Sequence, residues 1–154
     1  MKTIEGDLIK LALEGQFDVI VHGCNCFCAM GAGIAKSIKS EFPEAFEADL
    51  TTEKGAKQKL GSYSQVTVTR NGKSITIINA YTQFHWAGQG VKADYDAIRC
   101  VFSQLKAEFG DARIGYPMIG AGLAGGDWGV ISQIIDTELS GCDHTLVKYV
   151  PKPV

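Results

Sequence analysis

Apolar residues recur along the chain with two periodicities, and these predict strands and helices in alternation. A short β-branched run predicts a strand over residues 18–22, and further strands are predicted over residues 113–119 and 145–150. Apolar residues at helical spacing predict helices over residues 32–42, 95–109 and 128–139. The elements therefore follow one another in the order that is typical of an α/β domain.

One pair of strands is predicted to be antiparallel. Residues 62–69 alternate polar with apolar side chains, and Asn71-Gly72 separates them from the β-branched residues 74–79. Because Asn-Gly favours a tight turn, this pattern predicts a β-hairpin. Strands joined by helices, with one hairpin added, predict a three-layer α/β/α sandwich around a mixed central sheet. In such sheets ligands bind beyond the carboxyl ends of the strands.

Composition adds limits to this picture. A chain of 154 residues with 45% apolar residues can bury a core without disulfides, so we expect a single domain over residues 1–154 that acts as a monomer. A formal charge of −2 excludes a broad nucleic-acid or anionic-membrane surface, and any polyanion contact must be local. Five cysteines, no signal-like apolar run at the N-terminus and no long apolar segment lead us to expect a cytoplasmic protein that contacts no membrane.

Two glycine-rich segments lie between predicted strands and predicted helices. Loop one is Met30-Gly31-Ala32-Gly33-Ile34-Ala35, and loop two is Gly120-Ala121-Gly122-Leu123-Ala124-Gly125-Gly126. Glycine lets backbone N–H groups approach an anion closely, and the N-terminus of the helix behind each loop is expected to add a favourable dipole. Two such loops suit a diphosphate. The alternative is that these glycines only form tight turns.

Loop two also matches the G-x-G-x-x-G dinucleotide fingerprint, through Gly120, Gly122 and Gly125. The match begins too late in the chain for the remaining strands of a dinucleotide domain, and no acidic residue ends a following strand. A nicotinamide-dinucleotide oxidoreductase stays open as an alternative from another class of protein. An ATPase is disfavoured because no Gly-Lys-Ser/Thr sequence occurs.

The order of these motifs resembles the macrodomain family. The resemblance rests on Gly6-Asp7-Leu8, Val21-His22-Gly23-Cys24-Asn25-Cys26, loop one, and Ile119 through loop two to Asp127-Trp128. The chain is most similar to the branch of this family that contains small ADP-ribose-1″-phosphate phosphatases and hydrolases that remove ADP-ribose from acidic side chains or from DNA. The resemblance implies the α/β/α fold, ADP-ribose or a derivative as ligand, and no cofactor.

The resemblance also implies roles for single residues. Asp7 would accept a hydrogen bond from the adenine amine, with the backbone N–H of Leu8 facing the ring, and Asn25 would bond the distal ribose. Loop one would cover the distal ribose and one phosphate, and loop two the diphosphate. The residues alone leave other interpretations open: Asp7 as a helix N-cap and Asn25 as a turn residue after a strand.

Two aromatic residues lie near the predicted ligand. Tyr149 is a candidate platform beside the adenine, because an aromatic face stacks on a purine at small entropic cost. A core position on the last strand is the alternative for Tyr149. Trp128 is expected to bury its indole behind loop two rather than touch the ligand.

The candidate catalytic residues are Asn25, Asp127 and His85. Asp127 could act as general base or only cap the helix that begins at Trp128, and His85 could supply a proton or be an ordinary loop residue. Members of the family that cleave ADP-ribosyl esters or DNA adducts use a lysine and an aspartate. Gln83 and Ala124 stand at those positions here, which argues against a covalent lysyl intermediate.

The segment from His22 to Cys28 alternates His and Cys residues, but its spacing is unlike that of structural zinc sites, and we expect no metal. The main hypothesis is therefore a hydrolase that converts ADP-ribose 1″-phosphate to ADP-ribose and phosphate. A non-catalytic ADP-ribose-binding module and a hydrolase that removes ADP-ribose from protein or nucleic acid are the alternatives.

Overall fold

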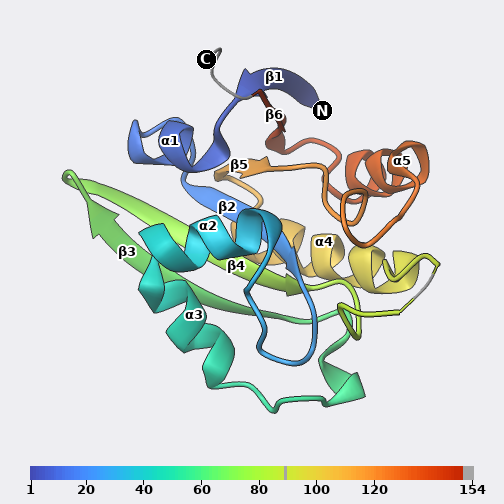
Figure 1. The fold of residues 1–154 in the computed structure, drawn as a ribbon. Coiled ribbons are helices and arrows are strands. Elements are labelled where there is room, and N and C mark those ends of the chain that lie inside the picture. The colour runs from blue at the N-terminus through green and yellow to red at the C-terminus, as the bar shows by residue number, and fades with distance from the viewer. Residues whose placement is uncertain (89, 151–154) are drawn as a thin grey trace.

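The computed structural model describes residues 1–88 and 90–150 and contains a six-stranded sheet (Figure 1). The strand order is β1-β6-β5-β2-β4-β3. The strands are β1 (Lys2–Gly6), β2 (Val19–Cys24), β3 (Tyr63–Arg70), β4 (Lys73–Tyr81), β5 (Arg113–Tyr116) and β6 (Asp143–Tyr149). Neighbouring strands are parallel except β3, which is antiparallel to β4, so the sheet is mixed.

Helices cover both faces of the sheet (Figure 1). The helices are α1 (Leu8–Leu13), α2 (Gly33–Glu41), α3 (Pro43–Leu50), the 3₁₀ turn η1 (Lys57–Lys59), α4 (Tyr95–Phe109) and α5 (Trp128–Glu138). Ile20 of β2 packs with α1, α2 and α3, whereas its neighbours Val19 and Val21 pack with α4 and α5. This alternation along one strand divides the core into two layers. The predicted three-layer α/β/α class is confirmed.

The predicted hairpin is present. Tyr63–Arg70 pairs with Lys73–Tyr81, and the turn residues Asn71 and Gly72 both have positive φ, 53° and 75°. Two residues with positive φ are what a two-residue hairpin turn requires.

β1, α3 and η1 were not predicted, α1 was foreseen only as the alternative in which Asp7 is an N-cap, and one strand is shorter than predicted. The sheet-edge strand β1 is almost entirely exposed and has no apolar run, and α3 is a short helix that begins at Pro43. The prediction for residues 113–119 extends too far, because β5 ends at Tyr116 and the next residue, Pro117, has no N–H to continue the ladder. Across residues 1–88 and 90–150, no helix is long and apolar enough to cross a membrane.

Candidate ligand-binding site

The carboxyl ends of five parallel strands meet at one edge of the sheet, and the predicted ligand residues follow these ends. Asp7 follows β1, Asn25 follows β2, and loop two comes after β5. Tyr149 ends β6 and pairs with Gly6 of β1. The expectation that both glycine-rich loops lie at one edge is therefore met, since the register of parallel strands places them there.

Loop one and loop two face each other across this edge. A Cβ atom built on Gly33 would lie 3.8 Å from Cδ1 of Leu123. Gly31 and Gly122 have open space where a Cβ would stand, so each loop presents bare backbone. Gly33 has φ of +58°, a left-handed conformation that favours glycine. The two loops can therefore approach one ligand from both sides.

Loop one leads into a helix with unpaired N–H groups. The N-cap of α2 is Ala32, whose side chain makes no capping hydrogen bond, and the first bond of the helix runs from the N–H of Lys36 to the Ala32 carbonyl. Within the described residues, the N–H groups of Gly33, Ile34 and Ala35 have no hydrogen-bond partner. An uncapped helix start of this kind attracts an anion.

Loop two presents unpaired N–H groups as well. The N–H groups of Gly125 and Gly126 bond carbonyls within the loop, and the Ala121 N–H bonds the carbonyl of Met118 just before it. In the part of the chain that the structure describes, the N–H groups of Gly122, Leu123 and Ala124 remain without a partner. Three consecutive amides of this kind form a second place for phosphate oxygens.

The helix behind loop two does not add the expected dipole. The side chain of Asp127 caps α5 by accepting a hydrogen bond from the Gly129 N–H at 2.8 Å. The Asp127 carboxylate already lies at the start of α5 and compensates the dipole of this helix. The prediction that a helix N-terminus behind each loop favours anion binding therefore holds only for loop one. The capping interpretation of Asp127 is confirmed, and its catalytic role stays a prediction.

Some glycines of loop two have a packing role. A Cβ on Gly126 would lie 2.5 Å from the carbonyl oxygen of Gly120 and 2.9 Å from Cδ1 of Ile131. A Cβ on Gly120 would lie 3.1 Å from the same Ile131 atom. The tight-turn interpretation therefore describes Gly120 and Gly126, while Gly122 faces open space.

Asn25 is nine-tenths buried, and its amide organises the start of loop one. Its Nδ2 donates to the Ala29 carbonyl at 2.9 Å, and its Oδ1 accepts from the Phe27 N–H at 2.9 Å. The turn interpretation of Asn25 is thus confirmed. Each of the two amide atoms retains hydrogen-bonding capacity, and a contact with the distal ribose stays a prediction.

A buried lysine also supports the segment between β2 and loop one. Lys59 is almost completely buried, and its Nζ donates to the Cys26 carbonyl at 3.1 Å and lies 4.6 Å from the ring centroid of Tyr81. The Tyr81 hydroxyl donates to Asp49, which is also buried and whose pKa is raised, chiefly by loss of solvent. Sequence reasoning missed this support, because nothing in the pattern around residue 59 distinguishes a buried lysine from an exposed one.

The strand below loop one carries a buried histidine. His22 Nε2 lies 2.6 Å from Oδ1 of Asn79, and burial lowers the pKa of His22 to about 4 despite that bond. Burial also raises the pKa values of the Cys24 and Cys26 thiols. All five cysteines are free thiols, and no group of three or more His, Cys, Asp or Glu side chains within the described ranges could hold a metal ion.

The predicted adenine residues lie beside α1. Asp7 caps α1 by accepting from the Lys10 N–H at 3.1 Å, so the N-cap interpretation is confirmed. Asp7 and Lys10 also line a groove of about 680 Å³ between α1 and α2. Leu8 is buried in the core, but its prediction concerns only its backbone N–H. Contacts of Asp7 and Leu8 with adenine stay predictions.

Two aromatic side chains near loop two and β6 differ in exposure. Tyr149 is 71% exposed, so the alternative of a core tyrosine is wrong, and its ring is accessible for stacking. Trp128 is partly buried against the core layer that contains α4 and α5, and its expected position away from the ligand stays a prediction.

Gln83 and Ala124 are both paired with the same residue, Ala93. Gln83 forms an isolated antiparallel bridge with Ala93, and the Ala124 carbonyl accepts from the N–H groups of Lys92 and Ala93. The side chain of Gln83 donates to the His85 carbonyl at 3.0 Å, and Ala124 is buried. The two positions are neighbours, but they carry an amide and a methyl group, not an ammonium and a carboxylate.

His85 belongs to an aromatic cluster that sequence reasoning missed. Its ring stacks on Trp86 at 4.1 Å, and both rings meet Phe27 edge to face. Nδ1 of His85 accepts from the Ala87 N–H at 2.9 Å, so Nε2 carries the ring proton and is the nitrogen free to donate a hydrogen bond. The run Phe84-His85-Trp86 could have indicated the cluster, but the partner Phe27 lies far away in sequence.

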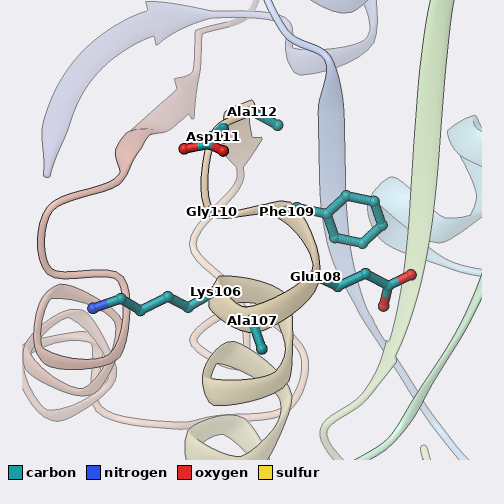
Figure 2. Close-up of a pocket in the computed structure, with 7 residues that line it drawn as sticks. All are labelled: Lys106, Ala107, Glu108, Phe109, Gly110, Asp111 and Ala112. Carbon is teal, nitrogen blue, oxygen red and sulfur yellow. The ribbon is translucent and has the colours of Figure 1, made fainter.

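A hollow of about 550 Å³ lies elsewhere (Figure 2). It is lined by Lys106 to Ala112, between the end of α4 and the start of β5. Because β5 begins there, this hollow is at the amino edge of the strands, away from the loops. None of the predicted ligand residues lines it, and it is not part of the candidate site.

Comparison with known proteins identifies the family. The family model for the Macro domain matches residues 21–135, which include loop one and loop two. The chain belongs to the Macro domain family. An uncharacterized 17.5 kDa protein of Enterobacteria phage T4, from the tk-vs intergenic region, is 38% identical over 98% of this chain and 97% of its own length.

Other similar proteins have names that refer to ADP-ribose or to a macrodomain. An ADP-ribose 1″-phosphate phosphatase of Aspergillus oryzae is 41% identical over a segment that covers 30% of this chain and 21% of that protein. The macrodomain of Mycobacterium tuberculosis DarG has a TM-score of 0.74 and 26% identity, with 98% of this chain and 97% of that chain covered. Thermosipho africanus DarTG in complex with ADP-ribose has a TM-score of 0.67 at 17% identity, with 99% of this chain and 42% of that chain covered.

Proposed function

We propose that the chain binds ADP-ribose with its diphosphate between loop one and loop two. The observation that carries this proposal is the pair of unpaired amide sets, Gly33 to Ala35 and Gly122 to Ala124, on two loops that face each other. Two separate anion-binding backbones match two linked phosphates. The adenine would lie toward Asp7 and Tyr149, and the distal ribose toward Asn25. Binding of ADP-ribose by a protein of the same fold supports this ligand.

We further propose that the chain hydrolyses ADP-ribose 1″-phosphate to ADP-ribose and inorganic phosphate. Water adds to the phosphorus atom, the bond from phosphorus to the ribose oxygen breaks, and that oxygen takes a proton. Asn25 would orient the distal ribose, and Asp127 would accept the proton of the water and return it to the leaving oxygen, to which the Nε2–H of His85 would donate a hydrogen bond. The loop-two amides would stabilise the charge that develops on phosphate.

Two observations favour the phosphatase over a lysine-dependent hydrolase. Gln83 and Ala124 occupy neighbouring positions without an amine or a carboxylate between them. The similarity to a protein named as an ADP-ribose 1″-phosphate phosphatase points the same way. The proposed reaction needs water and no cofactor.

The test is incubation of the protein with ADP-ribose 1″-phosphate and, separately, with ADP-ribosylated protein. We expect phosphate release from the first substrate, and Asn25→Ala should lower the rate at least about 100-fold. Retained binding of ADP-ribose by Asn25→Ala would show that the site is still formed. Release of ADP-ribose from the second substrate, without phosphate release from the first, would contradict the phosphatase proposal.

A binding module without turnover is the second candidate. It is favoured because the Asn25 amide is engaged with the Ala29 and Phe27 backbone, and the Asp127 carboxylate with the Gly129 N–H. Measurable ADP-ribose binding with no phosphate or ADP-ribose release from either substrate would establish this function in place of the enzyme.

A further inference from the structure

A buried ammonium group lies next to the segment that follows Asn25. Lys59 is 8% exposed, and its Nζ donates to the Cys26 carbonyl at 3.1 Å and to Sγ of Cys28 at 3.8 Å. Among the residues that the structure describes, no carboxylate forms a salt bridge with Lys59. Lysine is rarely buried in this way, because the loss of hydration is costly unless an anion compensates the charge. A carbonyl and a thiol compensate it only in part.

The buried carboxylate of Asp49 does not pair directly with this ammonium group. Asp49 accepts a hydrogen bond from the Tyr81 hydroxyl at 2.7 Å, whereas Nζ of Lys59 lies over the Tyr81 ring, 4.6 Å from its centroid. Loss of solvent raises the pKa of Asp49 despite the Tyr81 bond and the attraction of Lys59, so burial disfavours its charged form. The carboxylates of the described residues therefore balance the charge of Lys59 incompletely.

The charge of Lys59 lies at the distal-ribose end of the proposed site. The Cys26 carbonyl that Lys59 bonds belongs to the residue after Asn25, and the Gly55 N–H donates to the same carbonyl at 2.7 Å. The backbone directly after Asn25 is therefore held from one side by a cation and by a second donor of the same segment. A ligand that reaches Asn25 would come close to this charge.

Further positive side chains accompany Lys59, whereas loop one and loop two contain no charged side chain. Lys57 is exposed, and its Nζ lies 5.2 Å from the ring centroid of Phe84, whose carbonyl accepts the Cys26 N–H at 2.9 Å. Lys54 is also exposed, and Glu53 is the one acidic side chain in residues 53–59. The diphosphate would thus be held by backbone amides, while the cations lie at the end where a further phosphate on the distal ribose would stand.

We propose that Lys59 and Lys57 determine which group the site accepts on the distal ribose, and that they favour a phosphate over an uncharged group. Lys59 acts through space from behind the Cys26 peptide, because a charge in a buried position of low dielectric interacts more strongly at a given distance than one in water. The phosphate would supply an anion for the buried ammonium. The inference rests on the proposed orientation of ADP-ribose, and it adds specificity-determining residues to the proposed reaction.

The experiment compares two ligands by calorimetric titration: ADP-ribose, and a phosphonate analogue of ADP-ribose 1″-phosphate in which a methylene group replaces the 1″ oxygen. The analogue keeps the negative charge but cannot be hydrolysed, so its binding is measured whether or not the protein is an enzyme. We expect the unaltered protein to bind the analogue about tenfold more tightly than ADP-ribose. Lys59→Met, whose side chain fills similar space without a charge, should remove most of this preference, and Lys59→Arg should retain it.

Salt separates the contributions of the two lysines. Lys57→Gln should lower the preference for the analogue about twofold at low salt and have no effect in about 0.5 M salt, because exposed charges are screened. The effect of Lys59→Met should persist at high salt, since a buried charge is screened less. Lys73→Gln is the control, because it removes a charge at the amino end of β4, at the opposite edge of the sheet, and should leave the preference unchanged.

Equal weakening of both ligands by Lys59→Met would show that Lys59 only supports the backbone, and it would overturn the proposal. An unaltered protein that binds both ligands equally well would overturn it too. If circular dichroism shows that Lys59→Met does not fold, Lys57→Gln decides, and an unchanged preference at low salt would count against the proposal. Failure to bind ADP-ribose would refute the proposed function instead, whereas ADP-ribose binding without a preference for the analogue would refute this inference alone.

Discussion

Loop one leads into a helix without a side-chain cap, whereas loop two leads into a helix that Asp127 caps. Both loops still offer unpaired N–H groups, from the helix start in loop one and from the loop itself in loop two. An anion at loop one would therefore benefit from the helix dipole, while an anion at loop two would lie near a carboxylate. The two halves of the proposed diphosphate site are not equivalent.

The two loops are also supported in different ways. Side chains hold the segment that leads into loop one: Asn25 bonds the backbone of Phe27 and Ala29, and buried Lys59 bonds the Cys26 carbonyl. Close packing holds loop two, where Gly126 lies against the Gly120 carbonyl. Substitutions in the two loops should therefore differ in how much they change ligand binding and how much they change the free energy of unfolding.

The largest expected effect is at Gly33 in loop one. Gly33→Glu should weaken ADP-ribose binding at least about 100-fold, because its carboxylate would enter the phosphate site and repel the ligand. Gly33→Ala is the control, since it carries the same cost of about 1 kcal/mol for a left-handed backbone but no charge. Calorimetric titration measures both, and circular dichroism reports the fold. Equal loss of affinity in the two variants would refute the charge argument.

Acid should weaken the support below loop one. Burial lowers the pKa of His22 to about 4 from 6.5, so the unfolded chain takes up a proton before the folded protein does. The free energy of unfolding should thus fall by up to about 3 kcal/mol as the pH drops from about 6.5 toward about 4. Urea unfolding at several pH values measures this slope.

The control for the pH dependence is His22→Gln, which keeps a donor toward Asn79 but does not titrate. Its slope should be flatter, with a remainder from His144, whose pKa burial also lowers. An unchanged slope would show that His22 is not the group responsible.

A pair of glycine substitutions should separate packing from binding in loop two. Gly126→Ala should lower the free energy of unfolding by about 2 kcal/mol, because its Cβ would overlap the Gly120 carbonyl. Gly122→Ala, whose Cβ meets open space, should leave stability nearly unchanged and weaken ADP-ribose binding. Thermal unfolding and calorimetric titration of both variants measure this, and a reversed pattern would contradict the assigned roles.

The smallest expected stability effect concerns Asp127. Asp127→Ala removes the cap of α5 and should cost about 1 kcal/mol, whereas Asp127→Asn can still accept the Gly129 N–H and should cost less. If the carboxylate also acts as general base, both variants should lower phosphate release. Phosphate release by Asp127→Asn at the unaltered rate would restrict Asp127 to capping.

The parts of the fold that could be predicted from the sequence are those with a strong local pattern. β2, the hairpin, α4 and α5 carry strong apolar periodicity, and local pattern therefore identified them. β1 is exposed at the sheet edge, and α3 is short, so neither has a comparable signal. Loop one and loop two were predictable because glycine is itself a local signal for unusual backbone.

The supports of the site depend on contacts between distant residues. Lys59 reaches the Cys26 carbonyl from 33 positions further along the chain, and Trp86 meets Phe27 across two strands. No local pattern distinguishes a lysine or a tryptophan that will find such a partner. The sequence leaves both a capping and a catalytic role open for Asp127; the geometry of α5 confirms the cap, and the catalytic role stays a prediction.

A crystal structure of the protein with ADP-ribose tests the central claim most directly. We predict diphosphate oxygens at hydrogen-bond distance, about 2.7–3.2 Å, from N–H groups of both Gly33–Ala35 and Gly122–Ala124. A diphosphate that contacts one loop only, or that lies away from both, would contradict the account.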